Sequence, residues 1–324
     1  MTEKWLVGVD IGGTTIKIAF INADGEIIEK WEIPTDNSNE GNNIIEDIAN
    51  SIEQKRSALG VALQDIKGIG VGAPGPANLE TGRIEYATNL SWPDDYPLKE
   101  LLEAKIDLPI MINNDANCAA LGEMWKGAGN GERELVCVTL GTGVGGGIIT
   151  HGEIVQGVKG AAGEIGHITS IPNGGVPCNC GKTGCLETIA SATGIVRLAM
   201  NHINKAMVEE DELSGLYKEN GKITAKNVFD LARNGDKAAQ AIIAEVSFHL
   251  GFALANIANT LNPSKIVIGG GVSKAGEVLM TPVESHFKKY AFPNVAKSTT
   301  LVSAILGNDA GVIGAAWLIK SVGN

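Results

Sequence analysis

The chain has 324 residues, enough for about two domains of roughly 150 residues each. Hydrophobic residues make up 44% and charged residues 19% of the chain, an ordinary globular balance that excludes disorder throughout. The 37 acidic residues outnumber the 26 basic residues and give a net charge of −11. This charge disfavours nonspecific binding to nucleic acid or to an anionic membrane, since both need a basic surface.

Export and membrane insertion are also disfavoured. The apolar run after Lys4 ends at Asp10 and is too short for a signal-peptide core. Of the two uncharged stretches, 135–152 is interrupted by six glycines, and 246–264 carries three regularly spaced asparagines, which is typical of a buried helix with one polar stripe. Five cysteines, three of them crowded within 178–185, argue against a disulfide framework. We therefore expect a cytoplasmic protein.

The N-terminal part is predicted to be a β-meander followed by alternating helices and strands. Strands are predicted over 5–11, 16–21 and 26–33, joined by Gly12-Gly13 and by Asp24-Gly25, which is a good hairpin signal. A helix follows, with four isoleucines within 44–52 on one face. Strands over 66–72 and 108–112 each lead into a polar or glycine-rich loop, and a helix is predicted from Asp115 to about Lys126.

The opening pattern then repeats. Residues 136–143 (VCVTLGTG) align with 7–14 (VGVDIGGT), and both segments lead on to a Gly-Glu-Ile, at 152–154 and 25–27. This weak internal duplication predicts two α/β domains that face one cleft. Without a Pro- or Ser-rich linker between them, we expect a hinge. The remaining predicted elements are helices near 187–207, 224–233 and 236–260, a strand over 265–269, a helix from about 274, and a last helix over 309–320 capped by Asn308 or Asp309.

Three glycine-rich turns are candidates for binding a nucleotide. In the first, DIGGTTIK (10–17), glycine N–H groups can approach phosphate oxygens, and Asp10 could hold a metal-bound water. It lacks the Walker and Rossmann spacings, so a plain hairpin is the alternative. The second turn, GTGVGGG (141–147), favours a triphosphate held between two such hairpins. The third, GGGVS (269–273), could form the floor of an adenine pocket or a simple strand–helix turn. The predicted nucleotide contacts are Asp10, Gly12, Gly13, Thr14, Thr15, Lys17, Gly141, Thr142, Gly143, Gly269, Gly270 and Gly271.

A polar run, Asn113-Asn114-Asp115-Ala-Asn117, lies where a buried strand gives way to a helix. Asn and Asp are favoured helix caps, so each of these residues has an ordinary explanation. Several amide and acid side chains exceed what one cap needs, and an ionised Asp115 could accept a hydroxyl proton during phosphate transfer. The loop Gly72–Pro76 also follows a strand and could present backbone groups to a small polar ligand or form a tight turn.

The densest constellation predicts a metal site. His167, Cys178, Cys180 and Cys185 supply a complete Cys₃His set for a tetrahedral zinc. Sites closed by four protein ligands are structural, so this metal should fix a loop rather than take part in chemistry. The alternative, unligated buried thiols, fits poorly with the polar residues around the cysteines. Glu164 and Glu187 flank the ligands and could accept hydrogen bonds from sugar hydroxyls, or they could be ordinary surface glutamates.

These motifs together resemble the ROK family (repressors, open reading frames and sugar kinases), within the actin, Hsp70 and hexokinase-like ATPase superfamily. The resemblance covers nearly the whole chain and is greatest to the ROK glucokinases of Gram-positive bacteria. The segments that carry it are Asp10–Lys17, Gly72–Pro76, Asn114-Asp115, Gly141–Gly147, Glu164-x-x-His167 and Cys178-x-Cys180-Gly-x-x-Gly-Cys185-x-Glu187.

The resemblance implies a two-domain α/β fold of the actin/Hsp70/hexokinase-like ATPase type, with the ligand cleft between the domains. The expected small domain is 1–118 together with a C-terminal helix at about 305–324, and the large domain, 119–304, carries the zinc loop. The implied reaction is phosphorylation of glucose at its 6-hydroxyl by Mg-ATP, with Asp115 as catalytic base and Asp10 orienting magnesium through water. The implied sugar contacts are Gly75, Asn114, Asp115, Glu164, His167 and Glu187, the implied zinc ligands are His167, Cys178, Cys180 and Cys185, and a homodimer is usual for the family.

Other functions remain open or are disfavoured. Another hexose (mannose, fructose or an N-acetylhexosamine) or polyphosphate as donor is the alternative within kinases. A sugar-sensing transcriptional repressor is disfavoured, because Asp10 leaves no room for a preceding winged helix-turn-helix domain. An ATP-driven structural or chaperone protein does not account for the zinc loop.

Overall fold

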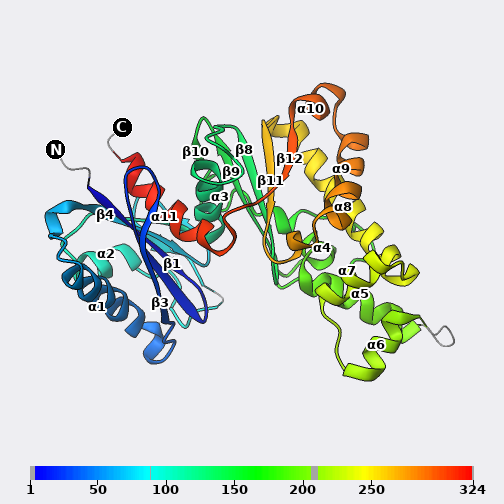
Figure 1. Ribbon diagram of the computed structural model, residues 1–324, viewed down its shortest axis with the longest axis horizontal. Helices are drawn as coiled ribbons and strands as arrows, with labels where there is room; N and C mark the ends of the chain where they lie inside the picture. The colour runs from blue at the N-terminus through cyan, green and yellow to red at the C-terminus, as the bar shows by residue number, and fades with distance from the viewer. Residues whose placement is uncertain (1–3, 88, 206–210, 323–324) are drawn as a thin grey trace. The chain divides into compact units, whose positions relative to one another are not determined.

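The computed structural model describes residues 4–87, 89–205 and 211–322. The chain divides into two compact units, one made of residues 1–133, 147–163 and 306–324 and the other of residues 134–146 and 164–305 (Figure 1). The predicted boundary at residue 118 falls inside helix α3 (Asp115–Trp125), which packs along helix α11 (Ala310–Ser321) within the first unit.

The first unit is built on a five-stranded sheet in the order β3-β2-β1-β4-β7. The meander β1–β2–β3 is antiparallel, whereas β4 runs parallel to β1 and β7 runs parallel to β4. The strands are β1 (Trp5–Ile11), β2 (Thr15–Ile21), β3 (Ile27–Pro34), β4 (Ile66–Ala73) and β7 (Ile110–Asn114), and a separate two-stranded pair comprises β5 (Ala77–Asn78) and β6 (Arg83–Ile84).

Helices cover both faces of this sheet. Alternate side chains of β1, such as Val7 and Val9, enter a core with the isoleucines of α1 (Asn43–Ala58) and the leucines of α2 (Leu98–Glu103), while Leu6 packs with α11. The strand–helix approach on the α11 face is very close. A Cβ on Gly70 of β4 would lie 1.7 Å from the carbonyl oxygen of Ala315, so only glycine fits there.

The second sheet has the order β10-β9-β8-β11-β12, with β8, β11 and β12 parallel and β9 and β10 antiparallel. It therefore repeats the strand order of the first sheet: a meander at one side and two parallel strands at the other. This repeat confirms the internal duplication that the sequence predicts. Its strands are β8 (Leu135–Leu140), β9 (Val144–Thr150), β10 (Glu153–Ile154), β11 (Lys265–Gly269) and β12 (Thr300–Ser303).

The helices of the second unit pack around α8 (Lys237–Leu261). Among the described residues α8 is the one helix long and apolar enough to cross a membrane, and 61% of its most apolar stretch is buried inside the fold, as in a core helix. Asn256 and Asn259 lie on its exposed side, as the predicted polar stripe requires. The others are α4 (Glu187–Ala190), α5 (Ala192–Lys205), α6 (Glu212–Asn220), α7 (Ala225–Asn234), α9 (Glu277–Tyr290) and α10 (Pro293–Ser298).

Three local expectations are corrected by the structure. The single helix predicted near 187–207 is two helices, because Ser191 is extended, with ψ 164°. The helix expected from about 274 starts at Glu277, after a turn that ends at Gly276 with φ 64°. Asp309 precedes α11 but its side chain makes no capping hydrogen bond. Its carboxylate instead pairs with Lys30 at 2.7 Å.

Candidate active site and zinc site

In the first unit, strand register brings the candidate catalytic residues to one edge of the sheet. Asp10 on β1 pairs with Gly72 on β4, and Gly72 pairs with Asn113 on β7. Because these three strands are parallel, their carboxyl ends lie side by side, where ligands of α/β proteins commonly bind. The register therefore places Asp10 beside the polar run that ends β7.

Asp115 is the first residue of α3, and its environment suits a general base. The helix cap is Asn114, whose Oδ1 accepts the N–H groups of Ala116 at 2.9 Å and Asn117 at 3.2 Å. The reading of Asp115 as the cap is therefore wrong. Burial, and secondarily the negative charge of Asp10, raise the pKa of Asp115 to about 6. A carboxylate with this pKa is largely ionised at neutral pH yet is a stronger base than an exposed aspartate.

Asp10 is half-buried and has one cation beside it. Burial raises its pKa, while Lys17, with its Nζ 3.6 Å from the carboxylate, partly counteracts the effect. Gly311, in the first turn of α11, also touches this carboxylate: a Cβ there would lie 2.7 Å from its carbon. Asp10 therefore faces the positive end of the α11 dipole.

The first glycine turn is held by the segment that follows β3. The Oγ1 of Thr35 donates to the carbonyl of Gly12 at 2.7 Å, the side-chain amide of Asn37 donates to the carbonyl of Gly13 at 3.2 Å, and the N–H of Thr35 donates to the carbonyl of Thr14 at 3.0 Å. Three successive carbonyls are thus engaged by one neighbouring segment. This arrangement suits a turn that binds an anion through its N–H groups.

Gly75 joins the same edge of the first unit. It has φ +94°, and its carbonyl accepts the side-chain amide of Asn114 at 3.1 Å. A Cβ at this position would lie 1.9 Å from the carbonyl oxygen of Tyr86, so the loop requires glycine. Gly75 and Asn114 are therefore brought together at this edge of the sheet.

In the second unit, the second glycine turn is tied to Glu187. One carboxylate oxygen of Glu187 accepts the N–H of Val144 at 3.0 Å, and a Cβ on Gly143 would lie 2.3 Å from that same oxygen. The start of α5 holds the turn from another side, since Ala192 and Thr193 donate to the carbonyls of Gly141 and Thr142. Glu187 is therefore half-buried and held against the second glycine turn, unlike an ordinary surface glutamate.

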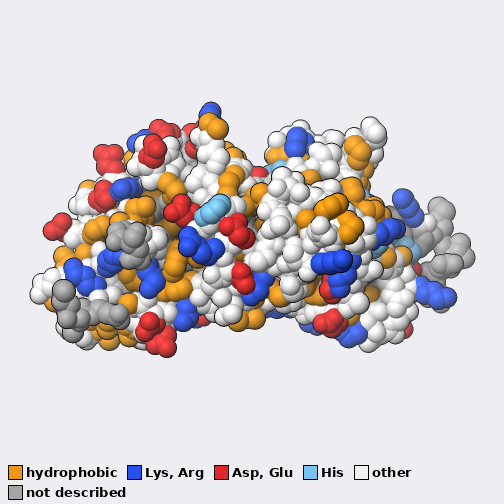
Figure 2. Space-filling view, turned by 90° about the horizontal axis from the view of Figure 1, so that it is seen from above, with side chains coloured by type: hydrophobic (Ala, Val, Ile, Leu, Met, Phe, Trp, Pro, Cys, Tyr) orange, Lys and Arg blue, Asp and Glu red, His pale blue; other side chains and the backbone are white. Residues whose placement is uncertain are grey.

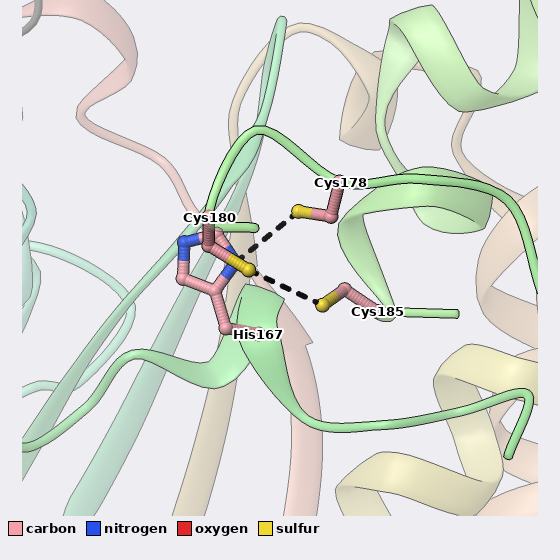
Figure 3. Close-up of side chains that lie close together, drawn as sticks. All are labelled: His167, Cys178, Cys180 and Cys185. Atoms are coloured by element: carbon pink, nitrogen blue, oxygen red, sulfur yellow. Dashed lines mark hydrogen bonds between the residues drawn. The ribbon is translucent and has the colours of Figure 1, made fainter. Parts of the chain in front are cut away.

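The four predicted metal ligands converge (Figure 3). The ligand atoms of His167, Cys178, Cys180 and Cys185 all lie within 4.8 Å of one another, with 3.6 Å between the Nδ1 of His167 and the Sγ of Cys178 and 3.6 Å between the Sγ atoms of Cys180 and Cys185. Zinc bonds of about 2.0–2.3 Å place tetrahedral ligand atoms roughly 3.4–3.8 Å apart. The donor set and its spacing therefore fit zinc.

Surrounding groups orient this cluster. The Nε2 of His167 faces the Oε2 of Glu164 at 3.9 Å, leaving Nδ1 for the cluster, and the second oxygen of Glu187 lies 3.8 Å from the Sγ of Cys178. A hydrogen bond from the backbone N–H of Lys182 lowers the pKa of Cys180, which favours the thiolate that a metal requires. The cluster therefore links the two glutamates predicted to contact sugar, one through His167 and one directly.

A cavity of about 650 Å³ opens beside the second glycine turn. Its lining includes Gly141, Thr142 and Gly271, so two of the three glycine turns predicted to bind a nucleotide meet here. Gly270 has φ +83° and would bring a Cβ within 2.4 Å of the Leu140 carbonyl, so this turn has a structural requirement as well. The remaining lining residues come mainly from α7 and from the turn after β11, namely Ala192, Thr224, Ala225, Lys226, Phe229, Asp230, Arg233, Val272, Lys274 and Ala275.

No sequence motif marks several of the residues that hold the glycine turns or line the cavity. Thr35, Asn37 and Gly311 act through contacts with segments distant in the chain, and Phe229 and Arg233 lie on an ordinary amphipathic helix. The surface view shows acidic and basic side chains interspersed on the visible face (Figure 2).

Comparisons with known proteins identify the family. The family model described as the ROK family matches residues 6–322. The chain is 53% identical over 324 residues to a glucokinase of Halalkalibacterium halodurans, covering 100% of this chain and 97% of that one, and 37% identical over 323 residues to a glucokinase of Thermotoga maritima, covering 99% and 98%.

A solved structure extends the match to the fold. The crystal structure of a ROK family glucokinase from Streptomyces griseus in complex with glucose and AMPPNP matches with a TM-score of 0.76 and 35% identity, over 97% of this chain and 98% of that one. This agreement confirms the predicted α/β fold of the actin/Hsp70/hexokinase-like ATPase type. The chain belongs to the ROK family.

Proposed function

We propose that this chain is a glucokinase, which transfers the γ-phosphoryl group of ATP to the 6-hydroxyl of glucose. The observation that carries the proposal is Asp115, a half-buried carboxylate with a pKa of about 6 at the carboxyl edge of a parallel sheet. The names of the relatives in Halalkalibacterium halodurans and Thermotoga maritima support glucose as the acceptor, as does the glucose bound to the Streptomyces griseus enzyme.

The proposed sugar contacts fall into two sets, one in each unit. In the first unit, Asp115 accepts the proton of the attacking hydroxyl, while Asn114 and the backbone at Gly75 hold neighbouring hydroxyls. In the second unit, the carboxylates of Glu164 and Glu187 accept hydrogen bonds from other hydroxyls of the sugar, and His167 donates one to the sugar. His167, Cys178, Cys180 and Cys185 would hold a zinc ion, which would fix these three residues in place without taking part in the chemistry.

The nucleotide uses the glycine turns. The turn at Gly12–Thr15 with Lys17 and the turn at Gly141–Gly143 hold phosphate oxygens, and the 650 Å³ cavity beside Gly271 takes the adenosine. Asp10 would hold the magnesium of Mg-ATP through water, and a cation there would offset the burial that raises the Asp10 pKa. The ion neutralises charge on the phosphates.

The adenosine cavity favours ATP over polyphosphate as donor. Polyphosphate has no base or ribose, so a 650 Å³ cavity with apolar walls such as Phe229 and Val272 would contribute nothing to its binding. The phosphate turns alone do not separate the two donors.

Initial rates with a panel of sugars and donors test the proposal. Purified protein should phosphorylate glucose with Mg-ATP at the highest kcat/KM, with lower values for mannose, fructose and N-acetylglucosamine. The position of the new phosphate should be the 6-oxygen by NMR. A higher kcat/KM for another hexose would reassign the substrate, and a higher rate with polyphosphate would reassign the donor.

A further inference from the structure

Two asparagines that flank Asp115 carry a role that neither helix capping nor substrate contact explains. Asn113 is 1% exposed and Asn117 is 2% exposed, so neither side chain faces the open edge of the site. Asn114 already accepts the N–H groups of Ala116 and Asn117 that a cap must satisfy, and the Oδ1 of Asp115 also accepts the N–H of Ala116 at 2.8 Å. The buried amides are therefore not needed to start α3.

The two amides join the end of β7 to the first turn of α3. The Oδ1 of Asn113 accepts the backbone N–H of Asn114 at 2.8 Å and the side-chain N–H of Asn117 at 3.0 Å. Because a backbone N–H can only donate, it fixes which atom of Asn113 is the oxygen, and Asn117 must then present its amide nitrogen. The chain of bonds spans residues 113–117 and encloses Asp115.

Stability does not account for this pair. The Nδ2 of Asn113 and the Oδ1 of Asn117 are both buried and have no hydrogen-bond partner among the described residues. Unsatisfied buried polar atoms destabilise a fold, so these two atoms offset part of what the hydrogen bonds of the pair contribute to stability. Strand β9 packs closely against this turn: a Cβ on Gly147 would lie 3.3 Å from the Oδ1 of Asn117 and 2.6 Å from the Cβ of Ala120.

We propose that Asn113 and Asn117 are positioning residues, which hold the strand–helix junction so that the Asp115 carboxylate and the Asn114 amide point at the substrate. The inference rests on the proposed function. A general base must lie within hydrogen-bond distance of the proton it removes, and an error of about 1 Å lowers a rate roughly 10²-fold. A packed junction without the amide pair keeps the fold but lets this geometry relax.

Asn117→Leu tests the proposal, because leucine has the same branched arrangement of side-chain heavy atoms but cannot donate to Asn113. We expect kcat for glucose phosphorylation to fall 10- to 100-fold. The KM for ATP should stay within twofold, and the zinc content and the melting temperature should remain close to those of the wild type. Asn117→Ala, which removes the same donor and favours the helix, should show the same split between kcat and the KM for ATP.

Ser247→Ala is the matched control, since Ser247 of α8 is also fully buried and its Oγ has no partner among the described residues. It should leave both kcat and melting temperature unchanged. A wild-type kcat in both Asn117 variants would overturn the proposal. Unfolding of both variants would also overturn it, because the asparagine pair would then be needed for stability. Lack of hexokinase activity in the wild type would instead contradict the proposed function.

Discussion

At the scale of single residues, the site depends on two carboxylates that cannot both be well solvated. Asp10 lies on β1 and Asp115 directly follows β7, two positions away in the sheet, and each has a raised pKa, mainly because of burial. Lys17 partly counteracts the rise in the pKa of Asp10, whereas no cation among the described residues lowers the pKa of Asp115. The two residues are therefore suited to different tasks, Asp10 to a cation and Asp115 to a proton.

Asp115→Asn separates the base from a merely structural residue. Asparagine keeps the shape but cannot accept a proton, so we expect kcat to fall by roughly 10²–10⁴-fold while the zinc content is retained. The wild-type kcat should itself fall as the pH drops through about 6, because the protonated acid cannot act as a base. A folded variant that kept more than about a tenth of the wild-type kcat would remove the assignment.

The same substitution has a stability consequence with a definite sign. The folded pKa of Asp115, about 6, lies above its ordinary value of 3.8, so proton binding favours the folded state. That stabilisation is complete below about pH 3.8 and is lost as the pH rises through about 6. Asp115→Asn should therefore be at least as stable as the wild type at pH 7.5, which thermal denaturation at pH 5 and pH 7.5 measures.

At the scale of elements, the second glycine turn and the zinc loop meet at one residue, Glu187. Its two carboxylate oxygens face the N–H of Val144 and the Sγ of Cys178, so α4 connects the turn to the metal cluster. The absence of a side chain at Gly143 makes this contact possible. The sequence marks both glycine turn and zinc loop but gives no sign that they touch.

Gly143→Ala should displace Glu187 from this contact. The new Cβ would lie 2.3 Å from the carboxylate oxygen, so we expect the KM for glucose to rise about tenfold, the loss of roughly one hydrogen bond to a charged group. Gly141→Ala is the matched variant, because its Cβ meets nothing within 4 Å. Its KM for glucose should be unchanged, and an equal rise in both variants would show that the effect comes from the turn and not from Glu187.

Much of the fold and part of the site were predictable because they depend on local pattern. Alternation and Asp24-Gly25 predicted β1 to β3, and the Cys and His spacing predicted a cluster that the structure brings together. Contacts between distant segments were not predictable. Nothing in the sequence near Thr35 or Gly311 indicates that one holds the first turn and the other touches Asp10, since these are consequences of packing.

At the scale of the whole chain, the duplication explains how one topology serves two tasks. Both sheets carry a meander and two parallel strands, yet the turn after the first strand in one unit lies beside Asp10 and in the other beside Glu187. The first unit supplies the base and the second the zinc loop and the cavity. Different loops on the same sheet topology are sufficient to give the two units these different tasks.

Two cavities of nearly equal volume lie among the described residues of the second unit, and one of these two is proposed to take adenosine. The cavity of about 650 Å³ adjoins Gly141 and Gly271, whereas the other, of about 660 Å³, is lined by His202, Asp211 and the start of α8. The volumes do not distinguish the two cavities. The position of the second glycine turn does, because an adenosine must lie within reach of the groups that hold its phosphates.

Filling each cavity with a tryptophan decides between them. Ala275→Trp occupies the cavity beside the glycine turns and should raise the KM for ATP at least tenfold and abolish the rise in melting temperature caused by AMPPNP. Ala241→Trp occupies the other cavity and should leave both quantities unchanged. Because neither alanine touches a proposed sugar contact, glucose should still stabilise both variants. If Ala241→Trp weakened nucleotide binding and Ala275→Trp did not, the adenosine would belong to the second cavity, and the role proposed for Gly269–Gly271 would be lost.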